Sequence, residues 1–101
     1  MGKGMKIYKY ILKEFRPGVE NYILMEKSAE ILTFKIQRNK FYKTDAAVIW
    51  AIIDETKIDD TKLRTFILYF TGDSLYNKND VYINTDIDKE GLVWHCFERF
   101  N

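Results

Sequence analysis

The sequence predicts an all-β domain, or a β-rich α+β domain, with six to seven mostly antiparallel strands in a sandwich or a partly closed barrel. Three observations lead to this fold class. Aromatic residues make up 16% of the 101 residues, and Ile and Val are frequent, which suits pleated, half-buried strands. Short segments alternate with period two between turn signals. No segment predicts a helix of three turns, and the connections are too short for crossover helices.

The N-terminal part predicts two strands around one turn. Residues 5–12 alternate in hydrophobicity and end before Arg16-Pro17-Gly18, where the chain must turn. Residues 19–25 form a second extended segment with poorer alternation. The two strands are therefore expected to be joined by a short loop.

The third strand has the clearer pattern. Residues 30–38 alternate, and we expect Leu32, Phe34 and Ile36 to share the buried face. Asn39-Lys40 then predict a turn. This strand should be half buried.

The middle of the chain predicts the centre of the sheet. Residues 46–53 are apolar at every position, which is typical of a strand covered on both faces or of a buried helix turn. The β-branched content and the short length favour the strand. Residues 54–62 form a polar excursion with room for one helical turn, and residues 64–70 predict a strand that is apolar on both sides.

The C-terminal part predicts two further strands after turn-rich segments. Residues 81–87 give the cleanest amphipathic pattern, with Val81, Ile83, Thr85 and Ile87 expected on one face. Residues 92–100 close the chain. In this last strand, Leu92, Trp94 and Cys96 are expected to face one way, and Cys96 is most simply a small buried apolar residue.

Length and composition indicate one globular domain, which we expect at residues 5–101 after an extension of residues 1–4. The chain is 47% hydrophobic and 31% charged, far from a disordered composition. Its longest apolar run is eight residues, whereas a membrane helix needs about 20. The N-terminus lacks a signal-peptide pattern, and Lys6 occupies the position where myristoylation requires Ser or Thr. A cytoplasmic location is therefore expected.

Charge is divided unevenly along the chain. Residues 1–43 contain ten Lys or Arg and four Asp or Glu, whereas residues 44–101 contain six and eleven. The division can indicate a basic surface for phosphates, or two surfaces that attract each other in a homo-oligomer. Strands from the two parts can also interleave and cancel the difference.

The sequence identifies no catalytic or metal-binding residues. His95 and Cys96 are the sole residues of their types, and neighbouring side chains of a strand point to opposite faces. Asp86, Asp88 and Glu90 recur at every second position, where carboxylates could hold a hard cation, but solvent-facing acids explain them more simply. No cofactor motif is present, so we predict no cofactor.

Basic and aromatic residues near one another give the candidate ligand-binding residues. Such a combination can stack a base and neutralise phosphates. Cross-strand tyrosine packing and solvated lysines are the simpler explanation. The candidates are Lys6, Tyr8, Tyr10, Arg38, Arg64 and Thr71.

Several short motifs together resemble a family of small phage-encoded proteins described as a domain of unknown function. The resemblance covers most of residues 5–98. It rests on Ile7-Tyr8-Lys9-Tyr10, Glu30-Ile31-Leu32, Trp50-Ala51-Ile52-Ile53-Asp54, Arg64-Thr65-Phe66, Thr71-Gly72 and Leu92-Val93-Trp94-His95-Cys96-Phe97-Glu98.

The chain departs from that family in two places. Ile11 stands where the family tends to have a proline, and Asp73-Ser74 stand where it tends to have His-Pro. Any role of that loop histidine therefore does not carry over. The resemblance implies an accessory phage protein in the cytoplasm of an infected bacterium.

The resemblance and the missing catalytic groups favour a non-enzymatic protein that counters host antiviral defence. One hypothesis is an oligomeric sponge for a nucleotide-derived immune signal, bound by the basic and aromatic residues. Its alternatives are a direct, anti-CRISPR-like inhibitor of a host defence complex, with the acidic residues 54–90 as a nucleic-acid mimic or docking surface, and a small virion or assembly protein. An enzyme with His95 as general base is the remaining reading. We expect a homo-oligomer, no membrane contact and no sequence-specific nucleic acid.

Overall fold

Seven strands account for most of the chain in the computed structural model, which describes residues 4–38, 44–75 and 77–100. The predicted turn at Asn39-Lys40 lies outside these residues. The polar excursion contains one 3-10 turn, η1 (Glu55–Lys57). The strands are β1 (Met5–Ile11), β2 (Glu20–Glu26), β3 (Glu30–Arg38), β4 (Asp45–Asp54), β5 (Thr61–Phe70), β6 (Asp80–Ile87) and β7 (Val93–Arg99).

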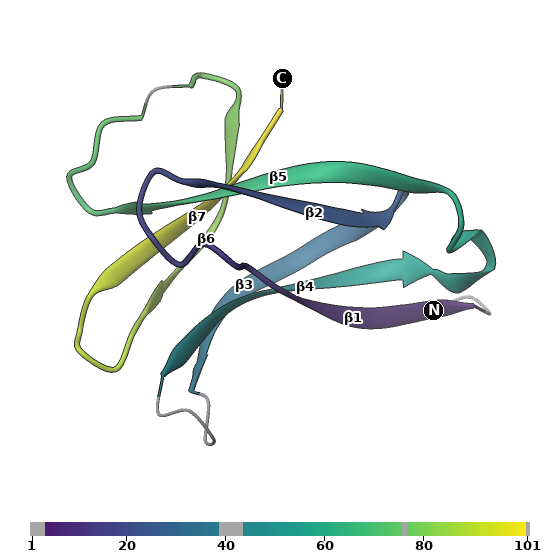
Figure 1. The fold of residues 1–101 in the computed structure, drawn as a ribbon, viewed down its shortest axis with the longest axis horizontal. Helices are drawn as coiled ribbons and strands as arrows, with labels where there is room; N and C mark the ends of the chain where they lie inside the picture. The colour runs from purple at the N-terminus through teal and green to yellow at the C-terminus, as the bar shows by residue number, and fades with distance from the viewer. Residues whose placement is uncertain (1–3, 39–43, 76, 101) are drawn as a thin grey trace.

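The strands form two antiparallel sheets (Figure 1). Sheet A has the order β1-β4-β3, and sheet B has the order β2-β5-β7-β6. The sheets are not closed into a barrel, so the predicted fold class is confirmed as an all-β sandwich of seven strands. No helix among the described residues is long and apolar enough to cross a membrane.

The core lies between the two sheets and takes one side chain in two from the central strands. Its largest fully buried members include Phe34 from β3, Ile49 and Ile53 from β4, and Phe66 and Leu68 from β5. Because residues of a strand alternate between faces, these spacings place the apolar positions on the inner faces.

The prediction for the centre of the sheet is confirmed in part. β4 is the middle strand of sheet A, and Ala47, Ile49 and Ala51 on its inner face are fully buried. On the other face, however, Trp50 and Ile52 are half-buried. The apolar outer side of β4 therefore borders solvent at Trp50 and Ile52, whereas Val48 on that side is 1% exposed.

A bulge changes the predicted face of β3. The register with β4 shifts between Ile31 and Thr33, so Ile31 and Phe34 both turn toward the core. Leu32, expected beside Phe34 in the core, is 43% exposed. The prediction was wrong at Leu32 because a bulge inserts an unpaired residue and breaks strict alternation.

A second bulge reverses the predicted face of β6. The register with β7 shifts between Tyr82 and Asn84, and Ile83 alone of the four expected apolar positions packs against the core. Val81 and Ile87 are 54% and 59% exposed. The residues beyond the bulge, Asn84 and Asp86, therefore turn toward sheet A.

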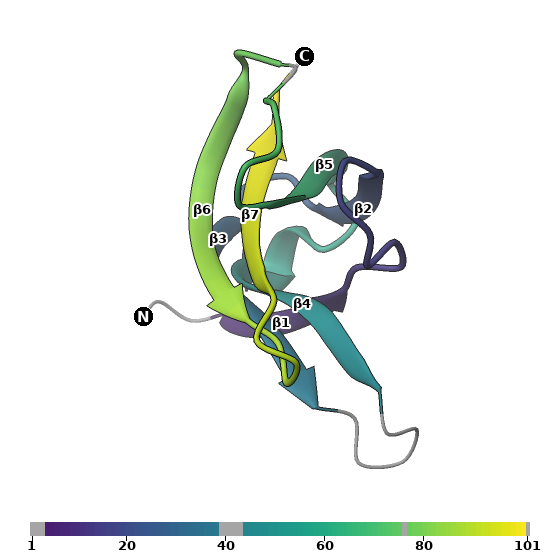
Figure 2. The same ribbon diagram turned by 90° about the vertical axis from the view of Figure 1, so that its left-hand side faces the viewer.

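These two side chains close the seam between the edge strands β3 and β6, which lie side by side in Figure 2. The Asn84 side chain accepts from the Phe34 N–H at 2.6 Å and donates to the Phe34 carbonyl at 2.8 Å. Asp86 Oδ2 accepts from the Ile36 N–H at 2.9 Å. Side chains thus replace the backbone ladder that would otherwise join the two sheets.

A second polar cluster lies on the outer face of sheet B. Asp80 accepts from Arg99 Nε at 2.8 Å and from the Tyr69 hydroxyl at 2.9 Å. Arg99 also donates to the Tyr69 hydroxyl at 2.8 Å and to Glu20 at 3.3 Å. The Asp80 side chain is 1% exposed, so its carboxylate depends on these partners.

Replacing Asp80 should change how stability depends on pH. The Arg99 guanidinium, with help from the Tyr69 hydroxyl, holds the pKa of Asp80 below its usual value. A lowered pKa in the folded state contributes stability above the unfolded-state pKa of about 3.9, and this contribution is lost as pH falls through the folded-state pKa. We therefore expect the free energy of unfolding to fall less steeply below about pH 4 in Asp80→Asn than in the unmodified chain.

Urea unfolding at a series of pH values measures this difference. Asp59→Asn is the matched control, since Asp59 is exposed in the loop before β5 and should reproduce the unmodified pH profile. Equal slopes for Asp80→Asn and the unmodified chain in acid would contradict the assignment.

Candidate functional site

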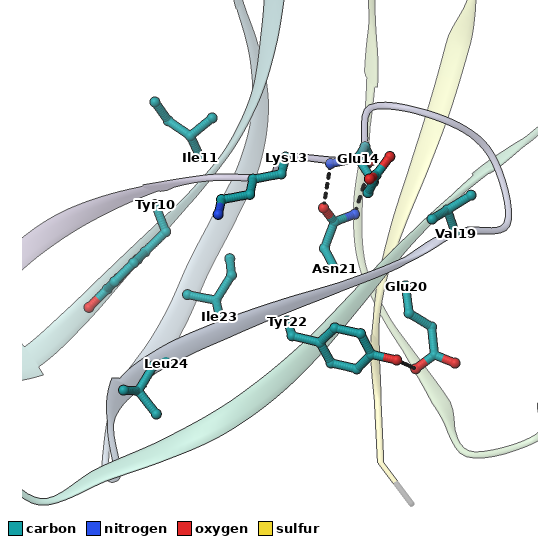
Figure 3. A pocket seen from close by; sticks show the side chains of 10 residues that line it. All are labelled: Tyr10, Ile11, Lys13, Glu14, Val19, Glu20, Asn21, Tyr22, Ile23 and Leu24. Carbon is teal, nitrogen blue, oxygen red and sulfur yellow. Dashed lines mark hydrogen bonds between the residues drawn. The ribbon is translucent and has the colours of Figure 1, made fainter.

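The seam opposite the one closed by Asn84 is open. β1 and β2 follow one another in the chain but belong to different sheets, and they diverge from the loop that joins them (Figure 1). A groove of about 550 Å³ lies between them. Its lining consists of Tyr10, Ile11, Lys13, Glu14, Val19, Glu20, Asn21, Tyr22, Ile23 and Leu24 (Figure 3).

One end of this groove is fixed by a buried asparagine. Asn21 Oδ1 accepts from the Glu14 N–H at 2.7 Å, and Asn21 Nδ2 donates to the Glu14 carbonyl at 3.0 Å (Figure 3). Asn21 is 4% exposed, so these bonds satisfy a polar group that burial would otherwise penalise. They hold the start of β2 against the loop that follows β1.

The walls of the groove are mixed in character. Tyr10 and Ile23 contribute partly buried apolar surface, whereas Tyr22 and Leu24 are 61% and 62% exposed. Lys13 is exposed, and Glu20 already interacts with the Tyr22 hydroxyl at 3.0 Å and with Arg99. The groove therefore presents apolar surface and a few charges of both signs.

The candidate ligand-binding residues do not converge on one pocket. Tyr10 lines the groove, and Tyr8 and Lys6 follow it along β1 toward η1. Lys6 Nζ lies 3.1 Å from Glu55, and the Tyr8 hydroxyl donates to the same carboxylate. This hydrogen bond raises the pKa of Tyr8 and lowers the pKa of Glu55.

The remaining candidates lie on other strands. Arg38 is exposed at the end of β3, and Arg64 and Thr71 lie on and just after β5, toward opposite ends of that strand. The Thr71 hydroxyl is 2.8 Å from His95 Nε2. The structure thus brings Lys6, Tyr8 and Tyr10 together and separates them from the other three.

Arg64 is held in a buried ion pair. Its Nε and its Nη2 donate to the two oxygens of Glu98 at 2.6 and 2.7 Å, and its Nη1 donates to the Ala29 carbonyl. The Arg64 and Glu98 side chains are 13% and 8% exposed. A guanidinium with this set of acceptors joins three segments of the fold and has little capacity for a phosphate.

His95 lies among hydroxyl groups on the outer face of sheet B. Its Nδ1 is 2.8 Å from the Thr85 hydroxyl, and its Nε2 contacts Thr71. Cys96 faces the opposite way, is fully buried, and has its thiol pKa raised by that burial. The predictions that these two residues face apart and that Cys96 is a small core residue are confirmed.

The alternating carboxylates are also separated. Asp86 bonds to β3 across the closed seam, and Asp88 lies in the following turn, where it accepts from Trp94 Nε1 at 3.0 Å. β6 ends at Ile87, so the three acids do not share a strand face. Within residues 4–38, 44–75 and 77–100, no group of three His, Cys, Asp or Glu could hold a metal ion.

Sequence reasoning missed the apolar outer face of sheet A. Ile7 pairs with Ile52, and Ile11 pairs with Val48, so these four side chains lie on the same face as Trp50. Ile7 and Ile11 are 51% and 60% exposed. The uninterrupted apolar run of β4 was the available signal, because a strand with one solvated face normally alternates.

Two lysines lie on this outer face. Lys9 pairs with Trp50, and its Nζ lies 5.8 Å from the centre of the indole ring. Lys35 is exposed on β3 and pairs with Val48. The face thus combines a tryptophan, branched aliphatic side chains and positive charge.

The chain belongs to the family of the domain of unknown function DUF7352, whose model matches residues 4–101. The comparisons with curated proteins and with solved structures returned no match. The family assignment confirms one part of the resemblance in the sequence, namely that the chain contains a domain of unknown function.

Proposed function

We propose that the chain is a non-enzymatic accessory protein of a phage that counters host antiviral defence by binding a defence protein directly. The proposed docking surface is the outer face of sheet A, where Ile7, Ile11, Trp50 and Ile52 are accessible. Val48 lies on the same face but is 1% exposed. The partner would present an apolar centre bordered by acidic groups, which would complement Lys9 and Lys35.

The apolar character of this face is the observation that carries the proposal. An exposed sheet surface normally presents polar side chains, whereas paired isoleucines lie here around a half-buried tryptophan. Tryptophan is among the residues most enriched where protein interfaces gain most of their affinity. A surface of this kind favours a protein partner over a small molecule.

Two other modes of binding receive less support from the contacts. A nucleotide sponge needs several free cations around an aromatic pocket, but Lys6 and Arg64 already pair with Glu55 and Glu98. An acidic docking surface needs free carboxylates, but Asp80 and Asp88 accept hydrogen bonds from Arg99 and Trp94. Heat of binding measured by calorimetry on adding a cyclic or linear nucleotide would instead support the hypothesis of a nucleotide sponge.

Substitutions on the outer face should abolish the effect on defence. In bacteria that carry a defence system sensitive to this protein, expression of the unmodified chain should raise the plating efficiency of a restricted phage. Trp50→Ala should weaken partner binding by about 2 kcal/mol, or roughly 30-fold in Kd, because it removes the central aromatic anchor. Ile7→Glu should act similarly by placing a charge among the apolar side chains.

Val81→Glu is the matched control, since Val81 is 54% exposed on β6, away from this face, and Ile7 is 51% exposed on β1. Circular dichroism should show the same folded signal for all variants. Protection lost in Val81→Glu and retained in Ile7→Glu and Trp50→Ala would overturn the proposed surface.

A further inference from the structure

The backbone of β1 offers one set of peptide groups to the open seam. The Leu12 N–H donates to the Ala47 carbonyl, and the Glu55 N–H donates to the Gly4 carbonyl, so the even-numbered residues of β1 point their peptide groups at β4. Peptide groups alternate in direction along an antiparallel strand. Those of Ile7, Lys9 and Ile11 therefore point away from β4, into the seam.

The backbone of β2 offers a matching set. The Lys27 N–H donates to the Asp60 carbonyl in the register of β2 with β5, which directs the odd-numbered residues of β2 toward β5. The peptide groups of Glu20, Tyr22 and Leu24 then point into the seam. Unpaired edges of this kind are templates for another strand.

We propose that a second copy of this chain occupies the open seam, with β1 of each copy pairing antiparallel to β2 of the other around a twofold axis. The seam is self-complementary because it contains both strands, so one rotation forms both pairings at once. The proposal concerns the edges of β1 and β2. It shares Ile11 with the outer face of sheet A but does not depend on the defence partner proposed for that face.

Side chains select one register for this pairing. With Ile11 opposite Tyr22 of the second copy, the residues whose peptide groups face the seam lie opposite one another. Ile11 and Tyr22 are 60% and 61% exposed in the single chain, and the pairing would bury them together.

The same register also places opposite charges together on the exposed side and apolar side chains together on the inner side. Lys13, which is exposed, would lie opposite Glu20 of the second copy. On the inner side, Tyr10 would lie opposite Ile23, and both already pack against the core. A slip by two residues toward Leu24 would instead place Lys9 opposite Glu26, which is 1% exposed and already accepts from the Asp54 N–H, and Lys13 would lose Glu20 as its opposite residue.

Cysteine cross-linking tests the register directly. Residues opposite each other in a hydrogen-bonded antiparallel pair have Cα atoms about 5.5 Å apart, within the range of a disulfide. The double variant Ile11→Cys with Tyr22→Cys should therefore form a covalent dimer under mild oxidation, whereas each single variant should not. The native Cys96 is fully buried and should not interfere.

Ile7→Cys with Tyr22→Cys is the matched control, because this pair is four residues out of register and should stay monomeric on a non-reducing gel. Native mass spectrometry should give a dimer for the unmodified chain and a monomer for Lys13→Glu, and Lys13→Glu with Glu20→Lys should restore the dimer. A monomeric unmodified chain at all concentrations, or equal cross-linking of the control pair, would overturn the proposal.

Discussion

Replacing Arg64 with methionine should destabilise the fold by about 3–5 kcal/mol. The change leaves the Glu98 carboxylate without its partner at a position that is 6% exposed, and an uncompensated buried charge is among the most costly defects in a fold. It also removes the hydrogen bond to the Ala29 carbonyl, which joins β5 to the start of β3. Urea unfolding at about pH 7 measures the loss.

The exposed pair between Arg16 and Glu14 provides the control. Arg16 Nη2 lies 2.7 Å from Glu14 Oε2, close to the distances in the buried pair, but the two side chains are 66% and 43% exposed. Solvent screens such a pair, so Arg16→Met should cost at most about 1 kcal/mol. Combining Arg64→Met with Glu98→Leu should recover most of the stability, since the stranded charge is then absent. Similar losses for Arg64→Met and Arg16→Met would contradict this account.

Replacing Asn84 with alanine should destabilise the fold by about 2–4 kcal/mol. The Asn84 amide satisfies both the N–H and the carbonyl of Phe34, a residue that is fully buried. Each backbone group left without a partner costs about 1–3 kcal/mol. Because no other strand of the described chain pairs with this edge of β3, the lost bonds are not replaced from within the sheet.

Thr85→Ala is the control on the same strand. Thr85 faces the opposite side of β6 and forms hydrogen bonds with Tyr82 and His95 on the outer surface, where water can replace the lost bonds. We expect a loss of less than about 1 kcal/mol. Hydrogen exchange adds a local readout, since the Phe34 and Ile36 amides should lose protection in Asn84→Ala alone. Unchanged protection there would contradict the role of the seam.

The order of strands along the chain could be predicted because each strand carries its own periodicity and turn signals. The alternating segment at residues 30–38 became β3 with the same bounds, and the apolar run at 46–53 became the middle of sheet A. The face of Leu32 and the faces beyond Ile83 could not be predicted, because a bulge shifts alternation without any sequence signal of its own, whereas Phe34 and Ile36 face the core as predicted. Asp86, which turns toward sheet A beyond the second bulge, was therefore expected to face solvent.

The arrangement of side chains at the site was less accessible from sequence. Whether Arg64 is a free cation or a partner of Glu98 depends on the pairing of β5 with β7, which places residues 34 positions apart in contact. The same pairing explains why His95 meets Thr71 across the strands. Residue types indicated a basic and aromatic half, but the strand order decides which of those charges remain available.

The closed seam between β3 and β6 limits how many copies of the chain can associate. A sandwich with four bare edges could add copies at both ends and grow into a fibre, because head-to-tail contacts that fail to close propagate without limit. Here the amide of Asn84 and the carboxylate of Asp86 occupy the N–H groups that a further strand would need. Pairing at the opposite edges would therefore end with a closed particle of two chains, and Asn84→Ala should expose this protein to filament formation.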